Sequence, residues 1–295
     1  MRHRLIRWVM AGALLCPSAT FANTILETAQ SFAVLGGAGV TVAGGGITTI
    51  SGNLGDYPSA LASITGFPPG VVVNGSTYAA DQGEATAQQA QTDEIAAYNY
   101  LVALPSTADE SNIVLGTGGT VASLLPGVYT FSGGTPSAQV DGTLTLNFNG
   151  ESDAVFVFQI GSTLTTGADA SIDVINANST DAIYWVVGSS ATLGSGTTFA
   201  GNILAYASIG LGTSAEIACG RALAQTGSVT MDGTNFISDN CSVDNTPGGY
   251  SPTGPTDFGS NGFAGTTPEP GTVALLSTGL LALILYRWQW RKRLA

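Results

Sequence analysis

Two six-residue runs decide the predicted fold: DAVFVF at residues 153–158 and DAIYWV at residues 181–186, each followed closely by a Gly-Ser pair. A second pair of runs, GNILA at 201–205 and GRALA at 220–224, repeats at an offset of 19 residues. Short apolar runs that return in this way indicate stacked coils of parallel strands, with loops of varying length between them. A β-sandwich also contains evenly spaced short strands and is the alternative, but it has little reason to repeat one run at the same point of each turn.

Five triplets share a further pattern, in which a branched aliphatic residue follows a small polar residue and precedes Thr or Gly. They are Thr143-Leu144-Thr145, Thr163-Leu164-Thr165, Thr192-Leu193-Gly194, Ser208-Ile209-Gly210 and Ser228-Val229-Thr230. Side chains alternate between the two faces of a strand, so the aliphatic residues are expected to point inward and their neighbours outward. Stacked coils would then present a flat, uncharged face whose candidate binding residues are Thr143, Thr145, Thr163, Thr165, Thr192, Ser208, Ser228 and Thr230.

Two other interpretations of these triplets stay open. Thr and Ser are soluble residues that suit exposed strand positions, so their presence does not by itself require a binding role. In addition, Gly194 and Gly210 leave their triplets with fewer hydroxyl groups. The binding face could therefore lie on the neighbouring strand of each coil instead.

One segment, from about residue 79 to residue 103, lacks the β pattern and is rich in Ala, Gln and Glu, which favour helix. Ile95, Tyr98, Leu101 and Val102 recur at spacings of three or four residues and form one apolar stripe. Pro105 follows the segment. The predicted fold is therefore mainly β, an irregular β-solenoid with one long α-helix packed alongside.

The two ends of the chain indicate export. Residues 1–22 combine three arginines, an apolar stretch and small residues, as in a cleaved signal peptide. The body, 23–245, is followed by a Gly-, Ser- and Pro-rich stretch, 246–267, that is typical of a flexible linker. Residues 268–295 contain Pro268-Glu269-Pro270, an apolar run and a basic end. This could be a plain membrane anchor, whose apolar run is near the short limit for a transmembrane helix.

The order of features in residues 268–295 more closely resembles the PEP-CTERM sorting tail of Gram-negative bacteria. That resemblance implies an exosortase-type processing enzyme as a partner, with the tail held transiently in the membrane. It also implies a host that makes exopolysaccharide. The expected location is extracellular or on the cell surface.

The body is depleted of the groups that most enzymes use. Arg221 is the only one of the 8 Lys and Arg residues that lies between the two ends, whereas all 20 Asp and Glu residues lie between Glu27 and Glu269. So acidic a chain should repel nucleic acid. The only histidine, His3, lies in the predicted signal peptide, which excludes histidine-based catalysis and histidine metal sites from the body. We expect no cofactor and no metal.

Two cysteines, Cys219 and Cys241, remain after the predicted processing. In an exported chain an even pair most simply forms a disulfide, and two unpaired buried thiols are the alternative.

Several runs together resemble the secreted ice-binding proteins of bacteria and fungi. They are FAVLG at 32–36, ISGNLGD at 50–56, ITGFP at 64–68, the helical QTD and AY at 91–93 and 97–98, and FVFQIGS at 156–162. The resemblance covers about residues 25–240. It implies a three-faced right-handed solenoid with the helix along one face and ice adsorbed on another, so the expected function is inhibition of ice growth or recrystallisation.

Parts of the sequence are also compatible with three other functions. An enzyme acting on polysaccharide could use Asp153 and Asp181, but both begin equivalent strands, where Asp more often stabilises a turn. An extracellular matrix or exopolysaccharide-associated adhesion protein is the main alternative. Its candidate sugar-binding residues are Tyr250, Phe258 and Phe263. The case for calcium binding at Asp239-Asn240 and Asp244-Asn245 is weaker, because the sequence contains neither an EF-hand nor a Gly-Gly-rich calcium repeat.

Overall fold

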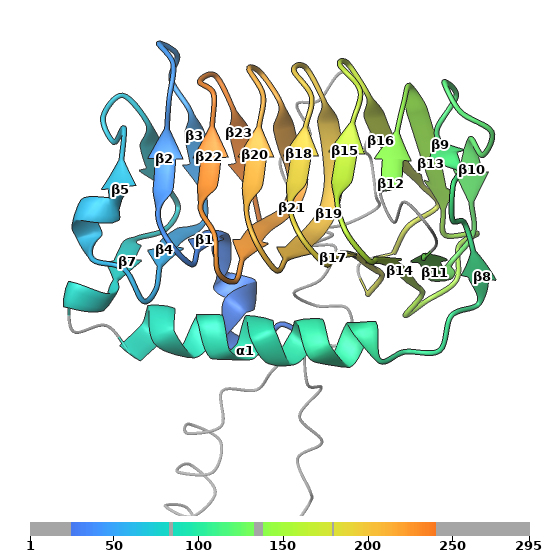
Figure 1. Ribbon diagram of the computed structural model, residues 1–295, viewed down its shortest axis with the longest axis horizontal. Coiled ribbons are helices and arrows are strands. Elements are labelled where there is room, and N and C mark those ends of the chain that lie inside the picture. The colour runs from blue at the N-terminus through green and yellow to red at the C-terminus, as the bar shows by residue number, and fades with distance from the viewer. Residues whose placement is uncertain (1–24, 83–84, 133–137, 179, 240–295) are drawn as a thin grey trace, which may run out of the picture. The chain divides into compact units, whose positions relative to one another are not determined.

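The computed structural model describes residues 25–82, 85–132, 138–178 and 180–239. Parallel strands form two sheets that coil around one core, and helix α1 (Ala85–Val102) lies alongside them (Figure 1). The predicted mainly β solenoid with one α-helix is confirmed. Three short 3₁₀ helices complete the described elements: η1 (Glu27–Ser31), η2 (Leu61–Ser63) and η3 (Ala80–Gln82).

The smaller sheet, called sheet B below, contains one short strand from each coil. Its eight strands lie in the order β5 (Ile64–Thr65), β2 (Val40–Val42), β22 (Val229–Met231), β20 (Ile209–Leu211), β18 (Ala191–Leu193), β15 (Leu164–Thr166), β12 (Ala138–Val140) and β9 (Val114–Leu115). All of the pairings are parallel.

The larger, 15-stranded sheet makes the other two faces of the coils. Its helix-side face contains β7 (Thr77–Ala79), β4 (Asn53–Asp56), β1 (Phe32–Gly36), β17 (Ala182–Val187), β14 (Val155–Ile160), β11 (Gly127–Phe131) and β8 (Ala108–Asp109). Its third face contains β6 (Val71–Val73), β3 (Thr49–Ser51), β23 (Phe236–Ser238), β16 (Ser171–Ile175), β13 (Thr143–Asn147) and β10 (Ser123–Leu124). Strands β19 (Thr198–Ala205) and β21 (Glu216–Ala224) run through the corner and belong to both faces.

Two glycines make this corner possible. Gly201 and Gly220 are paired and have φ values of 104° and 150°, which disfavour residues with a Cβ atom. A Cβ atom at Gly220 would lie 2.0 Å from the Gly201 carbonyl oxygen. The GNILA and GRALA runs therefore repeat because each coil must turn the same corner, and their residue-by-residue pairing is confirmed.

The coils do not stack in sequence order. The first two coils, residues 32–79, lie at one end of the stack; α1 then carries the chain to the other end, where the coil of β8, β9 and β10 begins (Figure 1). The following coils return until β22 and β21 pair with β2 and β1. The 18-residue helix is about 27 Å long, close to the roughly 33 Å spanned by eight parallel strands.

Aromatic rings stack in the core between the three faces. Tyr129, Phe158 and Trp185 are in register on β11, β14 and β17, and the Phe158 and Trp185 ring centroids lie 3.8 Å apart. The indole N–H of Trp185 donates to the Ala200 carbonyl at 3.0 Å. Matching DAVFVF to DAIYWV position by position is wrong by one residue, since Phe156 pairs with Ile183 rather than Tyr184. This shift places Tyr184 on the helix side and Trp185 in the core.

The predicted apolar stripe of α1 needs correction. Ala87, Ala90, Ala97 and Leu101 are buried together with the polar Gln91 and Glu94. By contrast, Ile95 is 40 % exposed and Val102 is 48 % exposed. The buried face of the helix therefore mixes small, polar and apolar side chains and is not the single apolar stripe that the spacing predicted.

Several sequence predictions lie wholly or partly outside the described residues. These are the signal peptide 1–22, the linker 246–267, the tail 268–295 and Cys241. Cys219 is 2 % exposed on β21. Among the described residues, no helix combines the length and apolar character of a membrane span.

Candidate functional site: the outer surface of sheet B

A row that is mostly threonine runs across sheet B, with one residue from each coil. Strand pairing aligns Thr65, Thr41, Thr230, Gly210, Thr192, Thr165 and Gln139 in that order. We call the six residues from Thr65 to Thr165 the central row. The hydroxyl-bearing members are exposed, except for the half-buried Thr41. Six strands of sheet B have three residues each, namely β2, β22, β20, β18, β15 and β12, and in all of them the residues on either side of the row are buried.

A second row of hydroxyl groups lies at the start of these strands. Thr163, Ser190, Ser208 and Ser228 each precede a buried aliphatic or Ala residue. The backbone N–H groups of Leu164, Ala191 and Ile209 donate to the carbonyls of Ser190, Ser208 and Ser228, which places the row in register. We call these four residues the lead-in row, and all four are half-buried.

The structure brings six of the eight predicted residues together on the outer surface of sheet B. Thr165, Thr192 and Thr230 belong to the central row, and Thr163, Ser208 and Ser228 belong to the lead-in row. Thr143 and Thr145 do not belong to either row, because they lie on β13 of the third face, beside Ser171 and Asp173. Their Thr-Leu-Thr triplet matches the pattern but belongs to another strand of the coil.

The alignment of the third triplet was also wrong. Thr192 lies beside Thr165, so it takes the second position of the row and not the first. Sequence reasoning missed Thr41, Thr65 and Ser190. The runs Val40-Thr41-Val42 and Val229-Thr230-Met231 carry a usable signal, but only the docking of the last coil on the first shows that they are neighbours.

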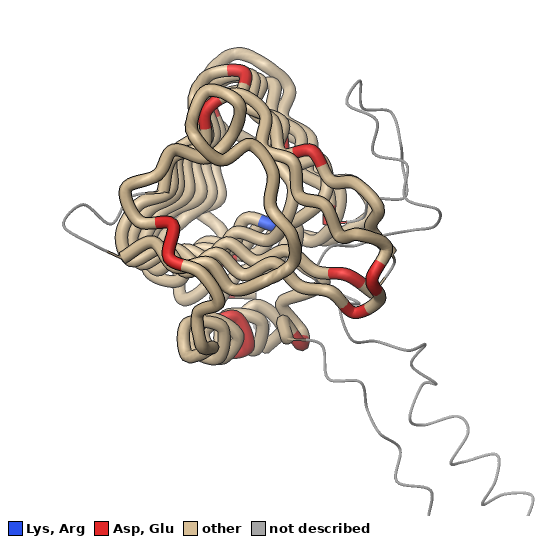
Figure 2. Tube along the Cα trace, turned by 90° about the vertical axis from the view of Figure 1, so that its right-hand side faces the viewer, with Lys and Arg blue, Asp and Glu red and all other residues tan. Residues whose placement is uncertain are grey.

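Sheet B is the uncovered face with the fewest charges. Figure 2 shows the acidic residues gathered at the corner turns and on the helix. On the third face, Asp173, Glu216 and the exposed Val71 interrupt the outward positions, and Thr198 donates to the Glu216 carboxylate at 3.1 Å. The helix-side face is covered by α1. Only sheet B, within the described part of the chain, combines exposure of its outward side chains with the absence of charged residues from its strands.

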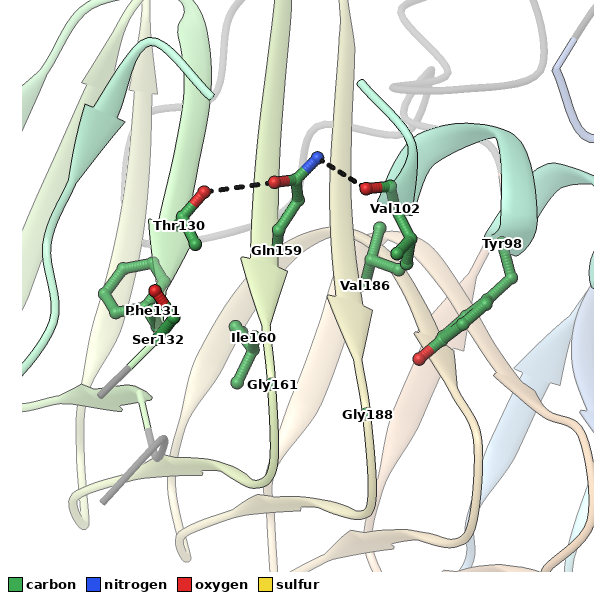
Figure 3. A pocket seen from close by; sticks show the side chains of 10 residues that line it. All are labelled: Tyr98, Val102, Thr130, Phe131, Ser132, Gln159, Ile160, Gly161, Val186 and Gly188. Atoms are coloured by element: carbon green, nitrogen blue, oxygen red, sulfur yellow. Dashed lines mark hydrogen bonds between the residues drawn. The ribbon is translucent and has the colours of Figure 1, made fainter. Parts of the chain in front are cut away.

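A cleft of about 500 Å³ opens between α1 and strands β11, β14 and β17 (Figure 3). The amide of Gln159, at the centre of the cleft, is hydrogen-bonded within the protein. Its Nε2 donates to the Leu101 and Leu104 carbonyls, both at 2.8 Å, and its Oε1 accepts from Thr130 at 3.0 Å. These bonds satisfy carbonyl groups at the end of the helix. The amide therefore has a structural role, which argues against the cleft as a polar binding site.

A buried carboxyl group lies under the helix. Glu94 is 0 % exposed and accepts from the Gln225 amide at 3.3 Å. Burial raises the pKa of Glu94 to about 8, and the Gln225 hydrogen bond opposes that rise. The group is thus mainly protonated at neutral pH. It lies far from sheet B in the coil and belongs to the interface of the helix with β21.

Asp181 and Arg221 also have structural roles. Asp181 is 1 % exposed and accepts from the backbone N–H groups of Asn178 and Ala154, as expected for a residue that stabilises a turn. Arg221 is 1 % exposed; its guanidinium donates to the Gln30 carbonyl at 2.7 Å and to Asn202 at 2.9 Å. Within the described residues, no cluster of His, Cys, Asp and Glu could hold a metal ion.

The family model described as ice-binding-like matches residues 34–237, which include every strand of sheet B. The chain belongs to this ice-binding-like family. An ice-binding protein of Nostoc sp. (strain HG1) is 43 % identical over 91 % of this chain and 88 % of that protein. The relatives are named as ice-binding proteins, a non-enzymatic class, in agreement with the prediction that this chain is not an enzyme.

Solved structures of the family have the same architecture. An ice-binding protein from the Antarctic ascomycete Antarctomyces psychrotrophicus is 36 % identical with a TM-score of 0.63, over 72 % of this chain and 96 % of that one. The matching domain of Shewanella frigidimarina ice-binding protein 1 is 32 % identical with a TM-score of 0.63, over 72 % of this chain and 95 % of that one.

Proposed function

We propose that this member of the ice-binding-like family adsorbs to ice through sheet B and inhibits ice growth or recrystallisation. The observation that carries the proposal is the central row, in which five threonines and one glycine from six successive coils share one outward register. Membership of the family supports the same function.

The physical argument rests on a regular and rigid grid. Adjacent coils repeat at about 4.7–4.9 Å, and alternate residues on a strand repeat at about 6.6–6.8 Å. The central row and the lead-in row therefore offer hydroxyl groups at two fixed repeats. Such a grid can hold water in an ordered arrangement like that of a crystal plane. Each contact is weak, but a rigid surface loses little entropy on binding, so many contacts add.

A single substitution tests which face is used. Thr192→Tyr in the full chain places a large ring in the middle of the central row and is expected to abolish thermal hysteresis and inhibition of recrystallisation. Thr145→Tyr is the matched control, since it makes the same change on the third face and is expected to leave both activities unchanged. Full activity of Thr192→Tyr, or its loss in Thr145→Tyr alone, would contradict the proposal.

The proposal extends to export and sorting. Residues 1–22 would be removed as a signal peptide, and an exosortase-type enzyme would process the tail at Pro268-Glu269-Pro270, leaving the body outside a Gram-negative cell. Mass spectrometry of the protein recovered from such a host would give both new ends. Recovery of a body that retains residues 268–295 would contradict the sorting step.

Two finer features also belong to the proposal. The coils would wind with a right hand, as the resemblance implies, and Cys219 would pair with Cys241. A crystal structure tests the handedness. The mass of the protein after thiol alkylation without a reductant tests the disulfide, because two alkylated cysteines would contradict it. Absence of ice activity in the intact chain would favour the alternative, a matrix or exopolysaccharide-associated protein.

A further inference from the structure

The central row contains one position without a side chain. Gly210 pairs with Thr192 on one side and with Thr230 on the other, so it occupies the site that a sixth threonine would take. It divides the row into a run of two hydroxyl groups, Thr165 and Thr192, and a run of three, Thr230, Thr41 and Thr65.

The fold does not require glycine at this position. A Cβ atom built on Gly210 would meet nothing within 4 Å, and Gly210 is not among the residues with positive φ. The nearby glycines differ: a Cβ atom would lie 2.6 Å from the Gly167 carbonyl oxygen at Gly194, and 2.9 Å from the Ser195 nitrogen at Gly212. Packing therefore accounts for Gly194 and Gly212 but not for Gly210.

Glycine is also an unfavourable residue for the strand itself. It has low β propensity and loses more backbone entropy on folding than any other residue, whereas threonine suits an exposed strand position. Neither local stability nor close packing explains this glycine. Its one distinctive effect is on the surface, where it removes a hydroxyl and a methyl group from the middle of the row.

We propose that Gly210 is the residue that limits how tightly sheet B holds ice. The gap separates two short hydroxyl runs, and water ordered over one run is not continued over the other. A threonine at position 210 joins the runs into six consecutive hydroxyl groups. This inference rests on the proposed function of sheet B and adds the position that sets its strength.

The test is Gly210→Thr in the full chain, compared with Gly45→Thr. Gly45 lies in the turn between β2 and β3, and a Cβ atom there also meets nothing within 4 Å. The two variants therefore make the same change with equal space, on and off the row. Gly210→Thr is expected to lower the concentration needed to inhibit ice recrystallisation by about two- to ten-fold, the effect of one net hydrogen bond on an equilibrium. Gly45→Thr is expected to match the parent chain.

The outcomes separate this inference from the proposed function. If Gly210→Thr leaves the concentration unchanged or raises it while Thr192→Tyr abolishes activity, sheet B binds ice and the inference about Gly210 is wrong. If Thr192→Tyr is fully active, the proposed function itself fails. Thermal unfolding monitors the fold of each variant, and Gly210→Ser, which adds the hydroxyl with less bulk, carries the test if the threonine variant is less stable than the parent.

Discussion

Strands β17 and β18 come from the same coil but meet different surroundings. All six residues of β17 are buried, because one side faces the core and the other faces α1. In β18 only Ala191 and Leu193 are buried, and Thr192 between them is exposed. One coil thus builds a covered face that stabilises the fold and an open face that is free to bind. Substitutions on the two faces should therefore separate stability from activity.

The largest expected effect on stability concerns pH at the covered face. An acid whose pKa is raised on folding, as for Glu94 from 4.5 to about 8, holds a proton that the unfolded chain releases. The free energy of unfolding should then fall as pH rises from about 4.5 to about 8, by at most about 5 kcal/mol. Glu94→Gln should flatten this fall in urea titrations, whereas Glu27→Gln, at an exposed carboxylate on η1, should not. An equal slope in Glu94→Gln and the parent would contradict the assignment.

The next effect concerns packing under the helix. Leu101 is 0 % exposed and belongs to the cluster that joins α1 to the helix-side face. Leu101→Ala is expected to lower the free energy of unfolding by about 2–5 kcal/mol because it leaves a cavity. Ice recrystallisation inhibition at a temperature where the variant is fully folded should be unchanged. Ala96→Gly, on the exposed side of the same helix, gives the scale of a change that costs only helix propensity, about 1 kcal/mol.

A smaller effect is expected where the helix ends. Gln159→Leu keeps the approximate size of the side chain but removes the hydrogen bonds to the carbonyls of Leu101 and Leu104. The expected loss is about 1–3 kcal/mol, since those carbonyl groups are partly buried. Hydrogen exchange should increase at the amides of the last helical turn. Unchanged exchange there would show that the Gln159 amide does not hold the helix end.

The smallest effect on stability is expected on the open face. Thr192→Val keeps the shape and exchanges the hydroxyl for a methyl group, so the free energy of unfolding should change by no more than about 0.5 kcal/mol. Ice activity should nevertheless fall measurably, because one hydroxyl of the central row is lost. A clear loss of stability in Thr192→Val, together with unchanged ice activity, would contradict the comparison of the two faces.

The sequence was sufficient to predict the class of fold, because repeats and an Ala- and Gln-rich segment are local signals. The sequence did not determine the register in which neighbouring strands pair. The match of DAVFVF to DAIYWV is displaced by one residue in the structure, since several apolar residues in a row fit a covered strand in either phase. The triplet at Thr143 was assigned to the wrong strand for another reason: β13 alternates buried and outward residues just as the strands of sheet B do, so alternation alone does not tell the two faces apart.

The candidate surface could be predicted only in part for a different reason. Thr165, Thr192 and Thr230 lie in coils that follow one another in the chain, so alternation and repetition find them. Thr41 and Thr65 lie much earlier in the chain, and their place in the row depends on the pairing of β2 with β22. Such a contact leaves no local pattern, and a single sequence contains no record of which coil meets which.

The pairing of the last coil with the first has a consequence for the chain's connectivity. If the end of β23 were joined to the start of η1 and the chain opened just after α1, every coil would follow its neighbour in the stack, from β8 through β23 and on to β7, and the helix would come last. The natural chain is thus a circular permutation of a simple solenoid. Its two halves meet within the central row, between Thr230 and Thr41, so one of the long-range contacts among the described residues completes the surface proposed to hold ice.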